Sequence, residues 1–460
     1  MADKKENDRV SATVKVKDLR CDYHIEPCDS TERPRRFLEA FASILKHTNY
    51  GFVLDHFSKN SAHCGRCAVA CPVYEVTGRI EDIPCRRSDL LLQVYRRHFT
   101  PSGKLRARLL GDPGLDDRKI DEMAEAFYRC TACRRCNLDC PMGLDHGLIT
   151  HLGRYILSEI GVVPKALVVA TREQLEGKTG NTSGIPKAAM LDTLEFLEEE
   201  LEEATGKKIK FPVDVEGADF AFFVAVSDYL LEPDTLMGQA ALFHATGDKW
   251  TIGSENFDGI NYGLFYSDWI LERVVRREIA EARRLKAKSV LIGECGHASR
   301  SAKGFITTYS DGDPLPVSNI MQYTARVIKE GRVKLDKDKI KQRVTYHDPC
   351  NLARSGWIVD EPRFILKSFV KDFVEMTPHG KANYCCGGGG GTVSLDEIHR
   401  FRMQVAGRKK AEQLKATGAD IVVAPCANCK KQLGEIIQEY ELDMEVKGLH
   451  DLILEAIILD

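Results

Sequence analysis

The spacing of apolar residues divides the chain into a helical first part and an alternating second part. The first helical segment begins near residue 36, and its apolar positions share one helix face: Phe37, Phe41, Ile44 and Leu45. The stretches 89–97 and 121–129 show a similar apolar spacing. Before residue 165 no segment alternates convincingly like a strand, so we expect this part of the chain to be all helical.

After residue 216 the pattern changes to short, continuous apolar runs separated by amphipathic segments. Four such runs predict buried strands: residues 220–226, 289–293, 344–346 and 421–424. Amphipathic segments at 273–285 and 399–414 predict helices that flank them. This alternation is typical of α/β domains, which place their ligands at the carboxyl ends of strands.

Two of these runs lead directly into cysteines, which suggests an internal duplication. Cys295 and Cys426 follow the runs 289–293 and 421–424 and lie 131 positions apart. The same offset, applied to Cys385 and Cys386, leads to Ser254 and Glu255. We therefore expect a first half that keeps the scaffold but has lost most of its thiols.

Composition and charge exclude several classes of protein. The chain has 460 residues, of which 43% are hydrophobic, and is long enough for two to four domains. Its 65 basic and 68 acidic residues argue against a nucleic-acid binder. No apolar run approaches the ~20 residues of a membrane span, and the polar residues 1–10 lack the apolar core of a secretory signal. We expect a cytoplasmic protein with no membrane span of its own.

Sixteen cysteines in a chain of this kind favour metal binding or redox chemistry over disulfides. One run, Cys130-x2-Cys133-x2-Cys136-x3-Cys140-Pro141, matches the bacterial ferredoxin pattern. In that pattern three thiolates hold one [4Fe–4S] cluster and the fourth reaches a neighbouring cluster. Zinc is disfavoured, because it usually takes two separated pairs of ligands.

An earlier run, Cys64-x2-Cys67-x3-Cys71-Pro72, matches the same pattern except that Ser61 replaces its first cysteine. Exchange of the fourth ligands gives one cluster with these ligands: Cys71, Cys130, Cys133 and Cys136. The other cluster has Cys64, Cys67 and Cys140 and needs a fourth ligand. Cys85 is the best candidate, because it is the only unassigned cysteine between the two runs. His63, Ser61 and a three-iron cluster are the alternatives.

A third set of five cysteines belongs to the second half of the chain: Cys350, Cys385, Cys386, Cys426 and Cys429. Adjacent thiols cannot point the same way in an extended strand, so Cys385 and Cys386 suit a bridging arrangement in a turn. Gly387, Gly388 and Gly389 open a run of five glycines, which lets backbone N–H groups approach an anionic cluster. A dinucleotide loop is excluded, because Thr392 and Val393 stand where its last glycine is required.

The order Cys350, Cys385-Cys386-Gly387, Cys426-x2-Cys429 resembles the CCG domain of heterodisulfide reductase catalytic subunits. The resemblance implies a non-cubane [4Fe–4S] cluster held by the five cysteines. A helical ferredoxin domain followed by paired CCG domains is similar to the D-type catalytic subunit of that family over about residues 36–450. The chain departs from the family pattern at Ser61 and at Ser254-Glu255.

Segments 294–298 and 346–350 further resemble the cytoplasmic iron–sulfur subunits of transmembrane redox complexes from sulfate reducers. The iron–sulfur subunit of the high-molecular-weight cytochrome c complex is the most similar, with tetrahaem-cytochrome and sulfite-reductase-linked complexes as alternatives. The resemblance implies ferredoxin-like, integral membrane and cytochrome partner subunits at the cytoplasmic face of the membrane, and a role in anaerobic respiration.

Three residues near the predicted site are candidates for a role in turnover: Cys295, His297 and His347. Histidine titrates nearest to neutral pH, so either imidazole is suited to give a proton to a departing thiolate. Structural hydrogen bonding at a strand end is the alternative for both. Cys295 is either a ligand or redox thiol or an inert buried cysteine. Cys21 and Cys28 have no partners at metal-binding spacing.

The combined prediction is an α+β multidomain protein in five parts. These are an N-terminal arm (1–35), a helical ferredoxin-like domain with two clusters (36–170), a linker (171–215), a degenerate CCG-like α/β domain (216–335) and a CCG domain (336–460). The resemblance implies that single electrons pass between the cubane clusters and the CCG cluster, which exchanges electrons with a disulfide or thiol substrate. The alternatives are an electron conduit for a flavoprotein that oxidises 2-hydroxyacids or glycerol 3-phosphate, and a non-catalytic docking subunit.

Overall fold

The computed structural model describes residues 32–111 and 114–459, which form two compact units. Unit 1 holds the described residues up to Val168 together with Phe265–Asp268 and Gly387–Lys409. Unit 2 holds the rest. Most of the predicted N-terminal arm, including Cys21 and Cys28, lies outside the described residues.

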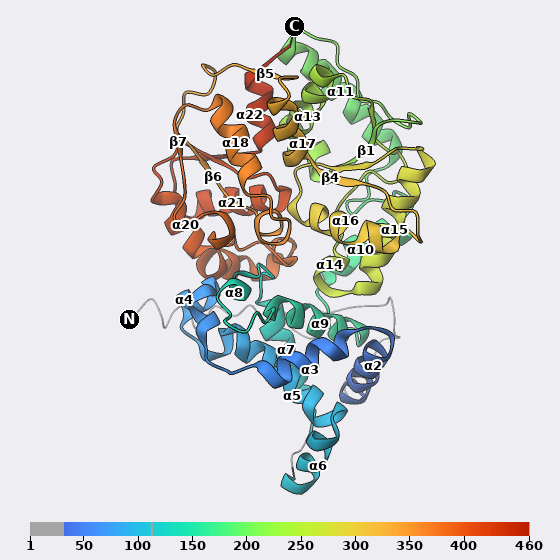
Figure 1. Ribbon diagram of the computed structural model, residues 1–460, viewed down its shortest axis with the longest axis vertical. Coiled ribbons are helices and arrows are strands. Elements are labelled where there is room, and N and C mark those ends of the chain that lie inside the picture. Colours follow the sequence, from blue (N-terminus) through green and yellow to red (C-terminus); the bar gives the residue numbers. More distant parts are fainter. Residues whose placement is uncertain (1–31, 112–113, 460) are drawn as a thin grey trace. The chain divides into compact units, whose positions relative to one another are not determined.

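Unit 1 is helical, as the apolar spacing predicted (Figure 1). Its helices are α2 (Arg33–His47), α3 (Tyr50–Asn60), η2 (Arg66–Ala70), α4 (Pro72–Thr77), η3 (Ile80–Asp82), α5 (Pro84–Phe99), α6 (Pro101–Leu110), α7 (Asp117–Tyr128), α8 (Arg135–Leu138) and α9 (His146–Glu159). The returning segment adds η6 (Thr392–Ser394), η7 (Asp396–Ile398), α19 (His399–Phe401) and η8 (Arg402–Ala406). Phe37, Phe41 and Ile44 are buried in its core, as predicted.

Local sequence explains where several of these helices begin. A proline stands in the first turn of α2, α4, α5 and α6, where its missing N–H costs no hydrogen bond. The side chains of Asp116 and Asp145 accept backbone N–H groups at the N-termini of α7 and α9. The proline that follows Cys71 therefore ends one cysteine run and starts the helix beyond it.

Unit 2 contains two four-stranded parallel sheets with the same strand order, β2-β1-β3-β4 and β7-β6-β8-β9. The first sheet consists of β1 (Phe220–Phe223), β2 (Trp250–Thr251), β3 (Val290–Ile292) and β4 (Val317–Asn319). The second consists of β6 (Val344–Tyr346), β7 (Phe373–Val374), β8 (Ile421–Val423) and β9 (Glu445–Lys447). The repeated order is consistent with the predicted duplication, and all four predicted strands are present.

The register of the two sheets changes the predicted correspondence between the halves. Ala221 pairs with Val290 in one sheet, and Val344 pairs with Ile421 in the other. The offset is therefore 131 for β3 and β8 but 123 for β1 and β6. The offset is 122 for β2 and β7, so it changes between β7 and β8, and the match of Cys385 and Cys386 to Ser254 and Glu255 stays a prediction. The first half has no cysteine between β2 and β3.

Helices surround both sheets and join the two halves of unit 2 (Figure 1). They are α10 (Lys165–Glu176), α11 (Lys187–Thr205), α12 (Ser227–Leu230), α13 (Pro233–Thr246), α14 (Gly263–Tyr266), α15 (Asp268–Arg284), α16 (Gly296–Tyr309), α17 (Ile320–Lys329), η4 (Asn351–Ser355), α18 (Asp360–Phe369), η5 (Gly380–Ala382), α20 (Arg408–Lys415), α21 (Ala427–Glu439) and α22 (Leu449–Ala456). Helix α13 packs on α22, α17 packs on α18, and α16 packs on η4. Strands β5 (Lys334–Leu335) and β10 (Ile457–Ile458) pair antiparallel.

The segment predicted as a linker, residues 171–215, is more ordered than its composition suggested. Helix α11 buries four apolar side chains along one face: Met190, Leu194, Leu197 and Leu201. In the preceding loop the buried Asn181 side chain donates to the Ile185 carbonyl at 2.8 Å. The Thr182 hydroxyl donates to Asp258 at 2.6 Å. These contacts explain why a stretch rich in glycine and polar residues packs within unit 2.

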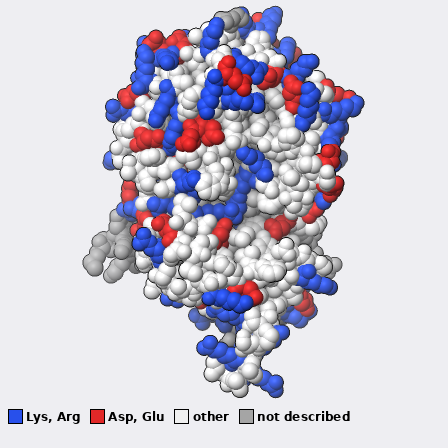
Figure 2. Space-filling view, viewed as in Figure 1, with Lys and Arg blue, Asp and Glu red and all other residues white. Residues whose placement is uncertain are grey.

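On the face drawn in Figure 2, lysine and arginine are interspersed with aspartate and glutamate, in keeping with the near-neutral net charge of −3. Within the described part of the chain, every helix is too short or too polar to cross a bilayer.

Candidate metal-binding sites

Four cysteines of unit 1 line one cavity: Cys71, Cys130, Cys133 and Cys136. This is the set predicted for one cluster by exchange of the fourth ligands. Ala132 and Arg134 adopt positive φ angles of 50° and 59°, and these left-handed turns bend the chain between the three close cysteines. The Ala132 N–H donates to Cys130 Sγ at 3.4 Å, a contact suited to a thiolate.

A second cavity of unit 1 is lined by the other set: Cys64, Cys67, Cys85 and Cys140. The Cys67 and Cys85 thiols are hydrogen-bonded, and this contact lowers the pKa of Cys85 to about 6. Leu144 N–H donates to Cys140 Sγ at 3.4 Å. Ser61 and His63 line the same cavity, so each alternative ligand also lies near it.

A buried arginine accompanies the first cavity. Arg87 lines it, and its side chain donates to the Asp82 carbonyl at 3.1 Å. Burial by itself lowers the pKa of Arg87, but the nearby Cys130 and Cys71 thiols more than offset this and the pKa is raised. A buried guanidinium among thiolates matches the negative charge of a thiolate-bound iron–sulfur cluster.

His146 lines both cavities, and sequence reasoning missed it. Its Nδ1 lies 2.9 Å from the Ser88 hydroxyl. Burial, with a smaller contribution from Arg87, lowers its pKa to about 4, so the ring is neutral at physiological pH. The available signal was its place at the start of α9, six positions after Cys140. That position alone did not predict that His146 lines both cavities.

The glycine run approaches the first cysteine set within unit 1. Gly390 has φ +66°, and a Cβ there would lie 3.1 Å from the Cys130 carbonyl oxygen. The buried Arg154 side chain donates to the Cys130 carbonyl at 2.6 Å and to the Gly390 carbonyl at 2.8 Å. Arg154 therefore fastens the glycine run to the backbone of a predicted cluster ligand.

The three predicted cofactor-binding glycines form a tight turn. Gly387 has φ +100°, and a Cβ there would lie 2.8 Å from the Gly407 nitrogen, so a close backbone approach requires glycine. The Gly388 carbonyl accepts from Val393 N–H at 3.2 Å, and the Gly389 carbonyl accepts from the Thr392 hydroxyl at 2.9 Å. Packing inside the protein thus accounts for Gly387, and contact with a cofactor stays a prediction for all three.

Four thiols of unit 2 form a connected group: Cys385, Cys386, Cys426 and Cys429. Cys386 and Cys429 Sγ atoms are 3.6 Å apart. Hydrogen bonds with Cys385 and Cys429 hold the pKa of Cys386 well below its usual range. Hydrogen bonds with Cys295 and Cys429 do the same for Cys426. The same hydrogen bonds raise the pKa of Cys429, so the group combines thiolates with neighbouring thiol donors.

Cys350 is the fifth cysteine of the predicted set and stands at the start of η4. Among the described residues no hydrogen bond joins it to the other four thiols. Cys350 follows β6 and Cys426 follows β8, and these two strands are adjacent and parallel. From β6 the chain goes to β7 on one side of the sheet, and it then continues with β8 and β9 on the other side. Ligands of α/β sheets bind outside the carboxyl ends of such a pair, so the fold brings Cys350 to the same sheet edge.

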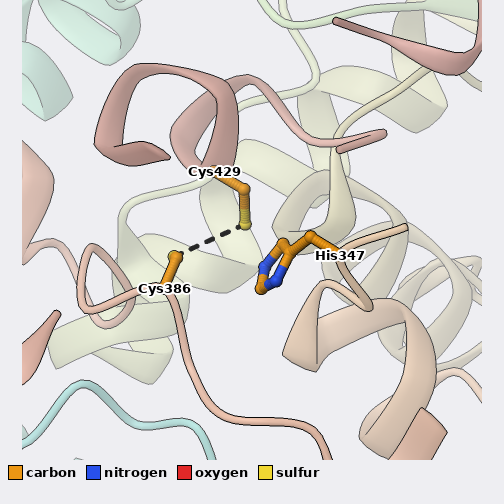
Figure 3. A group of neighbouring side chains, drawn as sticks. All are labelled: His347, Cys386 and Cys429. Carbon is orange, nitrogen blue, oxygen red and sulfur yellow. Dashed lines mark hydrogen bonds between the residues drawn. The ribbon is translucent and has the colours of Figure 1, made fainter. Parts of the chain in front are cut away.

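The predicted catalytic residue His347 lies beside this thiol group (Figure 3). A nitrogen of its ring and the Sγ atoms of Cys386 and Cys429 all lie within 4.8 Å of one another. The imidazole is buried, and its ring is hydrogen-bonded to the Cys386 thiol. A buried imidazole that contacts a predicted ligand is suited to orient and tune a metal site.

Cys295 and His297 belong to the first half of unit 2, and Cys295 contacts the same thiol group. The Cys295 thiol is hydrogen-bonded to Cys426, and its Sγ lies 3.6 Å from His297 Nδ1. The backbone N–H of Asn261 donates to His297 Nε2 at 3.0 Å. Because a backbone N–H can only donate, Nε2 must accept, and the proton of a neutral ring is on Nδ1, directed at Cys295.

Comparison with protein families identifies both cysteine-rich regions. Residues 61–144 match the 4Fe-4S dicluster domain, and residues 344–434 match the CCG cysteine-rich domain. The chain is 28% identical to iron–sulfur subunit 2 of an Hdr-like menaquinol oxidoreductase from Archaeoglobus fulgidus, over 96% of this chain and 86% of that one. It is 25% identical to the D-type subunit of the dihydromethanophenazine:CoB–CoM heterodisulfide reductase of Methanosarcina mazei, over 86% of this chain and 93% of the other.

The name of a more distant relative describes a different activity. An EtfAB:quinone oxidoreductase of Syntrophomonas wolfei is 20% identical over 84% of this chain and 56% of its own length. The chain thus carries a 4Fe-4S dicluster domain for two cubane clusters and a CCG domain, and along nearly its whole length it is similar to iron–sulfur subunits of heterodisulfide-reductase-like oxidoreductases.

Proposed function

We propose that this chain is the disulfide-active iron–sulfur subunit of a membrane-associated respiratory complex. The observation that carries the proposal is the connected thiol group of unit 2, which includes Cys386, Cys429 and Cys426 and is extended by Cys295. Such a group is more than a chain needs for electron transfer through two cubane clusters alone. The named relatives act on menaquinol or on a heterodisulfide, and the proposed chemistry is of that class.

We assign the cluster ligands as follows. The first cubane cluster is held by Cys71, Cys130, Cys133 and Cys136, and the second by Cys64, Cys67, Cys85 and Cys140. The choice of Cys85 is supported by its place in the second cavity and by its hydrogen bond with Cys67. The non-cubane cluster is assigned to Cys350, Cys385, Cys386, Cys426 and Cys429, with Gly387, Gly388 and Gly389 in the adjoining turn.

The bound clusters supply single electrons. Reduction of a disulfide takes two electrons and two protons and yields two thiols, so the site must also hold a proton near the sulfur that leaves. His347 is the assigned proton-bearing group beside Cys386. Cys295 is the assigned exchange thiol, and His297 orients it through Nδ1–H. The substrate is a small heterodisulfide or a pair of cysteines on a protein.

The partners follow from the same proposal. Electrons must reach lipid-soluble quinol or a cytochrome through other subunits. We therefore place the chain on the cytoplasmic face of the membrane, held there by integral membrane and cytochrome subunits and accompanied by a ferredoxin-like subunit.

A second candidate function is an electron conduit for a flavoprotein system. The similarity to an EtfAB:quinone oxidoreductase favours it, because that relative matches this chain over 84% of its residues. A conduit needs no reaction with disulfides. The two functions therefore differ in whether the cluster of unit 2 responds to thiols.

The test is low-temperature EPR of anaerobically purified, oxidised full-length protein, with and without an added small thiol. We expect a thiol-dependent signal in the wild type and its loss in Cys386→Ser, with the ferredoxin-type clusters still reducible. Cys295→Ala should keep the iron content and change the response to thiol. If added thiol does not change the EPR signal of oxidised, fully loaded wild-type protein, the disulfide function is refuted and the conduit is favoured.

A further inference from the structure

His347 is a buried imidazole beside the thiols of unit 2. The ring follows β6 directly and lies beside Cys386 and Cys429, and a side-chain hydrogen bond joins it to Cys386 (Figure 3). Its Nδ1 contacts Asn383, which leaves Nε2 for the sulfur atoms. Whether Nε2 is a donor or an acceptor there depends on whether it carries a hydrogen.

The orientation of the Asn383 amide answers this question. The Lys410 side chain donates to Asn383 Oδ1 at 2.8 Å. The Asp348 carbonyl can only accept, and it accepts from Asn383 Nδ2 at 3.3 Å. A flipped amide would lose both hydrogen bonds. Asn383 Nδ2 therefore faces His347 Nδ1, at 3.4 Å, as a donor.

A donor opposite Nδ1 determines the tautomer of His347. Nδ1 must offer its lone pair to Asn383, so the single proton of a neutral imidazole is on Nε2. We propose that Lys410 and Asn383 hold His347 in the Nε2–H tautomer, and that this N–H donates to a sulfur of the cluster bound at Cys386 and Cys429. The inference rests on the proposed cluster and deepens it.

Lys410 is suited to this role by its place in the fold. It lies at the start of α20, its side chain is fully buried, and it also contacts the Gln413 side chain. Burial of a lysine is costly unless its donors are used, so the contact with Asn383 helps to explain why it is there. Lys410 and Asn383 act through His347 and are positioning residues. Such outer-shell partners orient a group against a metal site and tune it.

The expected consequence is a shift in the reduction potential of the unit 2 cluster. An N–H donor to a cluster sulfur stabilises the more negative, reduced state and raises the potential. Loss of the donor should lower the potential by the equivalent of about a tenfold change in the reduction equilibrium, about 59 mV for one electron. A purely structural role for His347 predicts no nitrogen or proton coupling to the cluster.

The test uses full-length protein labelled with 15N-histidine and measures only cluster spectra, without substrate. Pulsed EPR in H2O and D2O should show a nitrogen coupling and an exchangeable proton in the wild type. His347→Leu should remove both and lower the potential. His347→Gln should restore part of the shift, because its amide N–H reaches a similar position. His379→Gln is the matched control, since His379 contacts the Met376 carbonyl and should change neither quantity.

The contribution of Asn383 is tested with two variants. Asn383→Leu should lower the potential as His347→Leu does. Asn383→Asp keeps the shape and the Lys410 contact, but its carboxylate accepts from Nδ1, so the exchangeable proton at the cluster should disappear. Unchanged couplings and potential in these variants, at full iron content, would overturn the inference. A wild-type protein without a unit 2 cluster would instead refute the proposed function.

Discussion

Arg154→Met should destabilise unit 1 and loosen its first cluster. The guanidinium is fully buried and donates to four backbone carbonyls of three segments that are far apart in sequence: Phe127, Cys130, Phe265 and Gly390. Methionine keeps much of the apolar stem but donates no hydrogen bond. The four carbonyls would then be left without this donor in a buried environment.

The size of the effect follows from these contacts. An unsatisfied buried polar group costs about 1–3 kcal/mol, and carbonyls with another partner cost less. Relaxation and water entry reduce the sum, so we expect a loss of about 3–5 kcal/mol in the free energy of unfolding, at the large end of the effects of single substitutions. Since Cys130 is one of the anchored residues, the first cluster should also be lost at lower denaturant concentration.

The assay is anaerobic urea unfolding, followed by circular dichroism and by the visible absorbance of the clusters. Arg108→Met on the exposed surface of α6 is the matched control and should stay within about 0.5 kcal/mol of the wild type. An Arg154→Met protein that unfolds at the wild-type midpoint and keeps its clusters would show that the anchoring is not needed.

Three further predictions concern single side chains. Cys85→Ser should convert the second cubane cluster to a three-iron cluster that EPR detects. Adding Ser61→Cys to this variant should restore four irons. An unaltered cluster in Cys85→Ser would exclude Cys85 as a ligand. Gly390→Ala should lower the thermal midpoint more than Gly418→Ala does. Both glycines have a positive φ, but of the two only Gly390 has atoms close to the position of an added Cβ. Equal shifts of the midpoint would contradict this close approach. Burial raises the pKa of Glu159 to about 8, above its unfolded value of 4.5, so unfolding releases its proton. Stability should therefore fall as pH rises from about 4.5 to 8, and a Glu159→Gln protein with the wild-type pH profile would show that Glu159 is not responsible.

The parts of this protein that the sequence predicted are those with a local signal. The helix at Phe37 and Phe41 and the two ferredoxin-type runs depend on spacings of a few residues, and they are found as expected. The buried strands β1, β3, β6 and β8 were also predicted, because each is a continuous apolar run. Strands β2 and β7 have two residues each, which is too short for a recognisable pattern.

The parts that were missed depend on contacts between distant segments. His146, Arg154, Asn383 and Lys410 are polar residues without a motif, and their roles come from neighbours that the fold brings together. The change in offset between the halves was missed for a related reason. A constant offset between duplicated halves assumes equal loops, whereas the loops between equivalent strands differ in length.

The most direct test of the central claim is the iron content of anaerobically purified wild-type protein and of Cys386→Ser, with Mössbauer spectra of both. Three four-iron clusters predict about twelve irons in the wild type and about eight in the variant, with the two cubane spectra unchanged. Equal iron content and identical spectra in the two proteins would contradict a third cluster at the thiols of unit 2.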